Sequence, residues 1–244
     1  MKLIVSDVLK NVPIADGIFS MAVSFAEGTL ASPGQFAMLY LPNGELLLPR
    51  PISISDANEG SLTFVYAVVG AGTAVLSRLQ PGDSLKLLAP LGKGFFISPI
   101  AKTPQKKPAI IGGGIGVAPL LYLAKTLASR GKQPDIYLGF RTAPYLVEEF
   151  EKYGHVHIAT EDGSVGHHGR VLDIFPQNKH DEIMACGPTP LLNAIAELSD
   201  TQKIPAQLSY EERMACGIGT CVGCVLEVEG TYFRICTEGP VFYT

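Results

Sequence analysis

The spacing of four cysteines near the carboxyl end constrains this chain more than any other feature. Cys216, Cys221, Cys224 and Cys236 follow the pattern C-x4-C-x2-C-x11-C. The chain has 244 residues and five cysteines, so four of the thiols fall within its last 29 residues. A tight loop must bring the first three thiols to one side, and the fourth must return from a separate segment.

This spacing is the plant-type pattern for a [2Fe–2S] cluster, which takes four thiolates, two for each iron. Gly217, Gly219 and Gly223 lie among the cysteines. Residues without a Cβ allow tight turns and let backbone N–H groups approach sulfur. The stretches "VLEVEG" and "YFRIC" predict a hairpin that returns Cys236 to the loop. The four cysteines are therefore expected to bind a [2Fe–2S] cluster.

Zinc and disulfides are the alternatives to a cluster. A structural zinc site with four cysteines usually has two C-x2-C pairs, and this chain has one, Cys221 and Cys224. The amino-terminal stretch "MKLIVSDVLKNVPIADG" lacks the features of a signal peptide, which predicts a cytoplasmic protein. Thiols stay reduced in that compartment, so clustered cysteines favour metal over disulfides.

The composition argues against several kinds of partner. The net charge is −4, and the lysines and arginines are scattered along the chain, so no nucleic-acid partner is expected. No apolar run approaches the length of a membrane span. With 47% hydrophobic residues, the chain can form one large or two medium cores.

The first section, residues 1–98, alternates short apolar runs with turn residues. Close spacing of such runs predicts an antiparallel barrel, with one short helix over residues 73–79. The predicted strands cover residues 2–9, 18–25, 35–41, 51–55, 62–69 and 84–90.

The second section, residues 105–206, follows a polar linker over 101–108 and alternates strands with helices. This order predicts a parallel sheet with helices on both faces. The predicted strands cover 109–113, 135–140, 156–160 and 182–187, and the helices cover 118–131, 146–154 and 190–200. The fold class is thus a β-barrel plus α/β, with residues 207–244 as a small cysteine-loop subdomain.

The second section also contains a candidate nucleotide site. A glycine-rich turn between a strand and a helix lets backbone N–H groups approach a pyrophosphate. The match to G-x-G-x-x-G is imperfect, and tight packing of the strand on the helix is the alternative explanation. In "MACGPTPLL" a later strand gives way to a helix at the edge where parallel sheets bind ligands. The candidate residues are Gly112, Gly113, Gly114, Gly116, Cys186 and Gly187.

Two short motifs in the barrel section suit a flavin nucleotide. "RPIS" (50–53) offers an arginine and a serine to a phosphate or a flavin edge. "GAGT" (70–73) places glycines and a threonine at the start of a short helix. Each motif alone could merely open an edge strand or cap a helix.

Taken together, these motifs resemble the ferredoxin reductase superfamily. The resemblance rests on "RPIS", "GAGT", "GGGIGVAPL" and "CGPTP" in that order. The tail, "EERMACGIGTCVGC" and "CTEGPVF", looks like the electron transfer subunits of bacterial dihydroorotate dehydrogenase B complexes. The likeness extends over the full length of the chain.

The resemblance implies FAD on the barrel, NAD on the second section and the cluster on the tail. It implies no catalytic residue, since the cofactors supply the chemistry. Relatives commonly have arginine where Ala67 stands, and Lys93 is a candidate for the missing charge. The implied FAD-binding residues are Arg50, Pro51, Ile52, Ser53, Val65, Tyr66, Ala67, Gly72 and Thr73. The loop over 160–169 is a candidate for the nicotinamide end, with a solvated loop as the alternative.

The family's partner is an FMN-containing catalytic subunit that oxidises dihydroorotate, with two copies of each subunit expected. The chain would pass electrons through [2Fe–2S] and FAD to NAD+, in pyrimidine (UMP) biosynthesis. One alternative is a subunit of another NAD(P)H-linked complex, of the sulfhydrogenase or bifurcating transhydrogenase type. The other is a redox-sensing or zinc-binding module without turnover.

Overall fold

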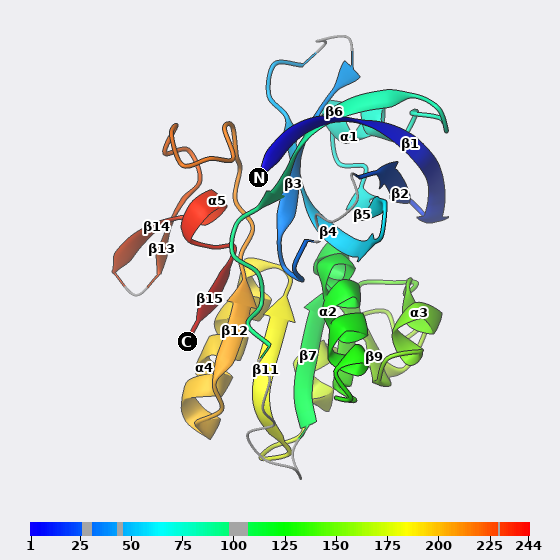
Figure 1. The fold of residues 1–244 in the computed structure, drawn as a ribbon. Helices are drawn as coiled ribbons and strands as arrows, with labels where there is room; N and C mark the ends of the chain where they lie inside the picture. The colour runs from blue at the N-terminus through cyan, green and yellow to red at the C-terminus, as the bar shows by residue number, and fades with distance from the viewer. Residues whose placement is uncertain (26–30, 43–45, 98–106, 229) are drawn as a thin grey trace. The chain divides into compact units, whose positions relative to one another are not determined.

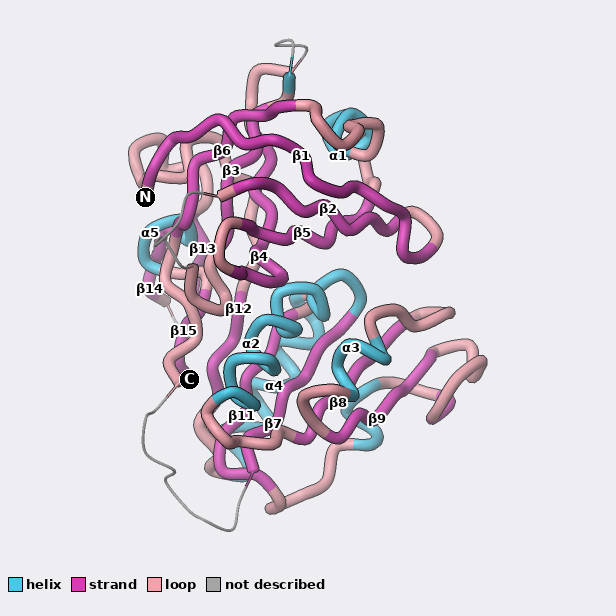
Figure 2. Tube along the Cα trace, turned by 45° about the vertical axis from the view of Figure 1, so that its right-hand side comes forward, coloured by secondary structure: helices cyan, strands magenta, loops and turns pink. Residues whose placement is uncertain are grey.

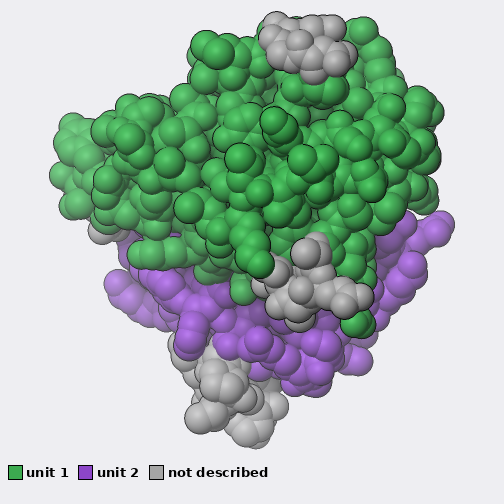
Figure 3. All heavy atoms as spheres, turned by 45° about the horizontal axis from the view of Figure 1, so that its top comes forward, with its two compact units in different colours: residues 1–94, 211–240 green, residues 95–210, 241–244 purple. Residues whose placement is uncertain are grey.

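The chain forms two compact units, coloured separately in Figure 3. The computed structural model describes residues 1–25, 31–42, 46–97, 107–228 and 230–244. Unit 1 comprises residues 1–94 and 211–240, and unit 2 comprises residues 95–210 and 241–244.

Unit 1 is built on a closed barrel with the strand order β1-β2-β5-β4-β3-β6 (Figure 1). Alternate residues fill its interior, such as Leu85, Leu87 and Ala89 of β6, because successive side chains of a strand point to opposite faces. The predicted antiparallel barrel is confirmed. Its strands are β1 (Lys2–Ala15), β2 (Ile18–Ser24), β3 (Phe36–Tyr40), β4 (Arg50–Asn58), β5 (Ser61–Ala67) and β6 (Ser84–Leu91). The predicted short helix is α1 (Ala71–Leu76).

Residues 211–240 complete unit 1 and hold the four clustered cysteines. They form the expected hairpin of β13 (Val225–Val228) and β14 (Thr231–Arg234), followed by α5 (Ile235–Glu238). The N–H of Lys93, just beyond β6, donates to the carbonyl of Gly239 at 2.6 Å. The cysteine segment therefore packs with the barrel, and Figure 2 traces its path beside β3 and β6.

Unit 2 contains a seven-stranded sheet in the order β10-β9-β8-β7-β11-β12-β15. All neighbours are parallel except β15, which runs antiparallel to β12. The strands are β7 (Lys107–Gly113), β8 (Asp135–Phe140), β9 (His155–Thr160), β10 (His167–His168), β11 (His180–Cys186), β12 (Ala206–Ser209) and β15 (Val241–Tyr243). The sequence did not predict β10, β12 and β15, which are too short to show a periodic pattern.

Helices cover both faces of this sheet, as predicted. Ile110 of β7 packs in one hydrophobic cluster with residues of α2 (Val117–Ser129) and α3 (Val147–Glu151). The next residue, Ile111, packs in a second cluster with residues of α4 (Thr189–Gln202). Short 3-10 turns cover Gly114–Gly116 and Val171–Ile174.

Two sequence predictions concern membranes and the linker. No helix in the described part of the chain is long and apolar enough to span a membrane. Most of the predicted linker, up to residue 106, lies outside the described residues.

Candidate functional site

The four clustered cysteines meet in unit 1 as two pairs. The N–H of Cys221 donates to Cys216 Sγ at 3.4 Å, and the N–H of Cys236 donates to Cys224 Sγ at 3.5 Å. A further N–H, from Gly219, donates to Cys236 Sγ at 3.1 Å and links the loop to the returning segment. Backbone donors directed at sulfur stabilise thiolates, the form that binds metal.

One thiol of each pair has a shifted pKa, and the two shifts have opposite directions. Partial burial alone would raise the pKa of Cys216, but N–H groups of Cys221 and Ile218 and the thiol of Cys221 lower it to about 6. Burial first, and then the nearby Cys224 thiol, raises the pKa of Cys236 to about 12. A bound cation would remove this penalty, because its positive charge favours deprotonated thiols.

Gly217 explains how the cysteine loop lies so close to the barrel. Its φ of 70° is in the left-handed region, which favours glycine. A Cβ at this position would lie 2.6 Å from Cγ of Met38, on β3. A side chain would thus force the loop away from the barrel surface.

The donor set fits a two-iron cluster. Within the described ranges, no three His, Cys, Asp or Glu side chains form a ligand group for a single metal ion. The cysteines instead come in two pairs, Cys216 with Cys221 and Cys224 with Cys236. A [2Fe–2S] cluster takes two thiolates for each iron, so each pair suits one iron.

Arg234 supports the cysteine loop, although the sequence did not single it out. Its Nη1 donates to the carbonyl of Gly219 at 3.3 Å, and its Nε lies 3.3 Å from Glu238 Oε2. The N–H of Arg234 also donates to that carboxylate, at 2.7 Å. The peptide of Gly219 therefore accepts from Arg234 on one side and donates to Cys236 on the other. An arginine two residues before a clustered cysteine was the signal that could have found it.

The three stretches expected to bind FAD lie together in unit 1. Arg50 to Ser53 open β4, and Val65 to Ala67 close the neighbouring strand β5. The N–H of Val65 donates to the hydroxyl of Ser55 at 3.0 Å. Gly72, in α1, lies so close to the guanidinium of Arg50 that a Cβ there would overlap it. A cation thus lies against a backbone without side chains, an arrangement that fits a phosphate.

Two of the expected FAD residues direct their side chains inward. Tyr66 is buried, and its hydroxyl donates to Asn11 at 3.1 Å. Burial raises the pKa of Tyr66 to about 12, against the opposing effect of this hydrogen bond. The hydroxyl of Thr73 bonds within its own turn, to the N–H of Val69 and the carbonyl of Gly70. These two residues therefore offer their backbone groups, rather than their side chains, to a flavin nucleotide.

Asn11 is a positioning residue that sequence reasoning missed. Its side-chain amide donates to the carbonyls of Leu76 and Leu79, at 2.8 and 2.9 Å. The same side chain accepts from Tyr66. It therefore fixes the carboxyl end of α1 to β1 and β5. No sequence signal marked it, because Asn11 lies beyond the strand predicted over residues 2–9.

The candidate nucleotide residues of unit 2 also come together. Gly112 and Gly113 end β7, and Gly114 and Gly116 form the turn into α2. A Cβ on Gly116 would lie 2.6 Å from Cα of Gly187 and 2.7 Å from the carbonyl carbon of Cys186. The ends of β7 and β11 therefore touch through backbone, at the edge of the sheet where parallel α/β folds bind nucleotides.

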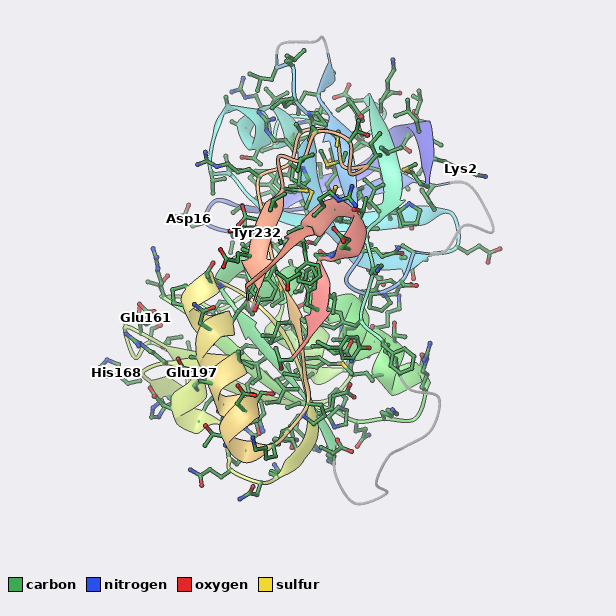
Figure 4. The ribbon with its side chains drawn as sticks, turned by 90° about the vertical axis from the view of Figure 1, so that its left-hand side faces the viewer. Lys2, Asp16, Glu161, His168, Glu197 and Tyr232 are labelled. Atoms are coloured by element: carbon green, nitrogen blue, oxygen red, sulfur yellow. The ribbon has the colours of Figure 1, made fainter. Side chains whose placement is uncertain are left out.

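The surroundings of this turn add Tyr145 and place the 160–169 loop. The hydroxyl of Tyr145 donates to the carbonyl of Gly114 at 2.9 Å. The loop follows β9 at the same edge of the sheet, and Glu161 and His168 mark it in Figure 4. Lys93 lies elsewhere, against the cysteine segment, where its charge lowers the pKa of Glu238 after the larger effects of Arg234.

The sequence of the chain is similar to one group of curated proteins. Residues 211–244 match the model of the iron–sulfur cluster binding domain of dihydroorotate dehydrogenase B. The dihydroorotate dehydrogenase B (NAD(+)) electron transfer subunit of Clostridium acetobutylicum is 41% identical over 243 residues, covering 99% of this chain and 95% of that protein. The same subunit of Geobacillus kaustophilus is 43% identical over 224 residues, covering 87% and 85%. The chain belongs to this family.

Solved structures agree with this membership. A chain from the electron-bifurcating NADH-dependent reduced ferredoxin–NADP oxidoreductase superposes with a TM-score of 0.86 at 30% identity, covering 98% of this chain and 87% of that one. Phthalate dioxygenase reductase superposes with a TM-score of 0.61 at 19% identity, covering 81% and 64%. The second likeness supports the fold alone. The predicted family, fold and oxidoreductase class are thus confirmed for this electron transfer subunit.

Proposed function

We propose that this chain carries electrons from a dihydroorotate-oxidising catalytic subunit to NAD+, in pyrimidine biosynthesis. Its cofactors are a [2Fe–2S] cluster, FAD and NAD, and its partner is an FMN-containing subunit present in equal number, two of each. The family supports the reaction, because relatives about 40% identical are named as NAD(+)-linked electron transfer subunits. We place the complex in the cytoplasm, where thiols stay reduced.

The pairing of the four cysteines carries this proposal. Two thiols approach each other in each pair, and backbone N–H groups point at three of the four sulfurs. A cluster held in this way supplies one-electron transfer, and a flavin and a nicotinamide supply hydride transfer. The loop's role is to hold the four cysteine side chains close together, so that a cluster can bind them as thiolates.

The barrel's role is to bind and orient the flavin nucleotide. Arg50 provides a fixed positive charge beside the backbone of Gly72, which suits a diphosphate. The backbone of Val65 to Ala67 runs next to it on β5. Because Ala67 has no charge, Arg50 is the phosphate-binding cation of this group.

Unit 2 binds the nicotinamide nucleotide at the carboxyl edge of its sheet. The turn over Gly112 to Gly116 offers backbone N–H groups at the start of α2, whose dipole favours a pyrophosphate. Gly187 likewise leaves the end of the neighbouring strand, β11, without a side chain. We assign NAD rather than NADP, following the names of the relatives.

Replacement of one cluster ligand tests this function. We expect Cys221→Ser to abolish NAD+ reduction by dihydroorotate in the complex, while the NADH oxidation by an artificial acceptor that needs only flavin persists. The contents of iron and acid-labile sulfide should fall together with this activity. Cys186→Ser is the control for iron content, since Cys186 lies in unit 2. Unchanged dihydroorotate-dependent activity in Cys221→Ser would place the cluster outside the electron route.

A second function rests on the 30% identity to the bifurcating oxidoreductase chain. This chain would then serve another NAD(P)H-linked complex with the same cofactors. Native purification separates the two functions, because only the first yields a dihydroorotate-oxidising partner. A redox-sensing or zinc-binding module would lack the yellow-brown absorption of flavin and iron–sulfur.

A further inference from the structure

The glycine-rich turn of unit 2 contains a peptide whose direction is fixed from outside the turn. Gly114 opens the turn with a φ of 54°, in the left-handed region. Its carbonyl accepts two hydrogen bonds, from the N–H of Val117 within the turn and, at 2.9 Å, from the hydroxyl of Tyr145. Tyr145 lies 31 residues further along the chain. A side chain from another segment therefore holds this carbonyl.

The direction of the carbonyl determines what the other side of this peptide presents. In a planar trans peptide the carbonyl and the following N–H point in opposite directions, so the N–H of Ile115 points away from Tyr145. The first N–H groups of a helix have no acceptor within it and suit an anion. Gly114 and Ile115 are only half-buried, and a Cβ on Gly114 would meet no atom within 4 Å. A ligand can therefore reach this peptide.

Packing fixes the ring of Tyr145. The ring lies edge-on to Phe140, with ring centroids 5.1 Å apart, and packs against the hydrophobic cluster that joins α2 and α3 to the sheet. These two helices lie side by side (Figures 1 and 2). Burial raises the pKa of Tyr145 to about 12, so its hydroxyl remains a protonated donor at neutral pH.

The residue after Tyr145 adds an independent observation. Leu146, the N-cap of α3, has a φ of 62°. The left-handed region is rare for a bulky side chain, and such conformations cluster at functional sites, where the surrounding contacts hold them. This one lies in the turn that brings Tyr145 against Gly114.

We propose that Tyr145 is a positioning residue for the nicotinamide nucleotide, acting on its pyrophosphate. The hydroxyl holds the peptide between Gly114 and Ile115 with its N–H outward, so the diphosphate meets a donor that is already in place. A donor fixed beforehand binds more tightly, because it loses less freedom when the ligand arrives. The inference rests on the proposed function, since it takes this turn as the nucleotide site.

The proposal predicts which part of the nucleotide responds to loss of the hydroxyl. NADH and ADP-ribose should weaken alike, because both contain the diphosphate and only NADH carries the nicotinamide. The limiting rate of hydride transfer should not change, because the hydroxyl acts on the phosphates rather than on the reacting ring. The loss of one neutral hydrogen bond corresponds to roughly a two- to tenfold change in affinity.

Removal of the hydroxyl tests this role in the complete protein with its cofactors bound. Tyr145→Phe should raise the Kd for NADH, measured from flavin reduction in rapid mixing, and the inhibition constant of ADP-ribose by the same factor, roughly two- to tenfold. The limiting rate, flavin content and iron content should stay at wild-type values. Tyr153→Phe is the matched control, since Tyr153 packs against the same cluster and its hydroxyl has no hydrogen-bond partner in the described part of the chain.

The outcomes separate the residue from the function. If the wild-type protein binds both nucleotides and Tyr145→Phe binds them as tightly, Tyr145 has no positioning role and the proposed function stands. The proposal also fails if Tyr153→Phe weakens binding as much, because packing would then be the cause. It fails too if only the limiting rate falls, because the hydroxyl would then act on the nicotinamide. If the wild-type protein neither binds ADP-ribose nor reduces its flavin with NADH, the proposed function fails as well.

Discussion

At the scale of single residues, the cysteine loop depends on a small number of polar contacts. Arg234 links the carbonyl of Gly219 to the carboxylate of Glu238. The N–H of the same glycine donates to Cys236. In such a chain of hydrogen bonds each bond polarises the next. A charge outside the ligand set can therefore influence the electron affinity of a cluster bound by these thiols.

We expect Arg234→Gln to lower the reduction potential of the bound cluster. The reduced cluster carries one more negative charge, so loss of a nearby cation destabilises it. The stability of the fold should change little, because the ion pair is exposed to solvent and screened by it. A redox titration followed by electron paramagnetic resonance measures the potential.

The control for this experiment is Arg213→Gln. Arg213 is an exposed arginine in the same part of unit 1. Equal shifts in both variants would mean that net charge, rather than the contact with Gly219, sets the potential. No shift in Arg234→Gln would remove Arg234 from the electrostatics of the site.

At the scale of elements, function depends on contacts between strand ends. The turn after β7 reaches the end of β11 because Gly116 and Gly187 meet backbone to backbone. No side chain fits between them. Each helix that follows begins close to its strand, which leaves the backbone N–H groups of α2 free to face a ligand.

Gly116→Ala should therefore weaken NADH binding and destabilise unit 2. Its φ of −63° suits alanine, so the cost comes from overlap of the new methyl group with Gly187, about 1–3 kcal/mol. We expect the KM for NADH to rise several-fold with artificial acceptors. Steady-state kinetics and thermal unfolding measure the two effects.

The control variant Gly131→Ala separates the effect of atomic overlap from the effect of backbone strain. Gly131 lies beyond the other end of α2, with a φ of 73° and open space around its Cβ. It should cost about 1 kcal/mol in stability and leave the KM unchanged. If Gly116→Ala also left the KM unchanged, the contact between the strand ends would have no part in binding.

At the scale of the whole molecule, the two units differ in their titrating groups. All five histidines lie in unit 2. His180 is fully buried, with Nδ1 3.1 Å from the carbonyl of Lys107 and Nε2 3.0 Å from the hydroxyl of Tyr137. These partners suit the neutral ring, with Nδ1 as donor and Nε2 as acceptor.

The groups around His180 determine the sign of its pH dependence. Burial lowers the pKa of His180, against the opposing effects of the Lys107 carbonyl and the Asp135 carboxylate. Burial likewise lowers the pKa of His157, which stacks on Tyr137 at 4.7 Å. Burial of Asp135 would raise its pKa, but Lys179, 2.8 Å away, together with His180 and Lys107, lowers it. The pKa shift of Asp135 therefore favours its ionised form.

We expect unit 2 to lose stability as the pH falls below about 6.5, the ordinary histidine pKa. The folded-state pKa of His180 lies below that of the unfolded chain, so the unfolded state binds more protons in this window. The loss approaches about 1.4 kcal/mol per pH unit for one such histidine. Hydrogen exchange on the complete protein at pH 7.0 and 5.5, corrected for intrinsic rates, measures it for each unit.

Unit 1, without histidines, should keep its protection over the same range. His168→Gln is the control, because His168 is exposed and its loss should leave the pH dependence intact. Equal loss of protection in both units would show that the effect does not come from the buried histidines.

The sequence by itself determined the local features of this protein. Short apolar runs separated by turn residues predicted all six barrel strands. The C-x4-C-x2-C-x11-C spacing predicted the cysteine loop, and the stretches "VLEVEG" and "YFRIC" predicted its hairpin. Such features depend on backbone geometry within a few residues, so a short stretch of sequence suffices. The strands β10, β12 and β15 were missed because they are too short for that signal.

Only the tertiary structure decided which distant segments meet. It brought Arg50 against Gly72, Gly116 against Gly187 and Gly217 against Met38. It also turned Tyr66 and Thr73 inward and gave Asn11 and Arg234 their positioning roles. Apart from the turn around Thr73, these contacts join residues far apart in the chain. Their geometry follows from the packing of whole elements, which no local pattern encodes.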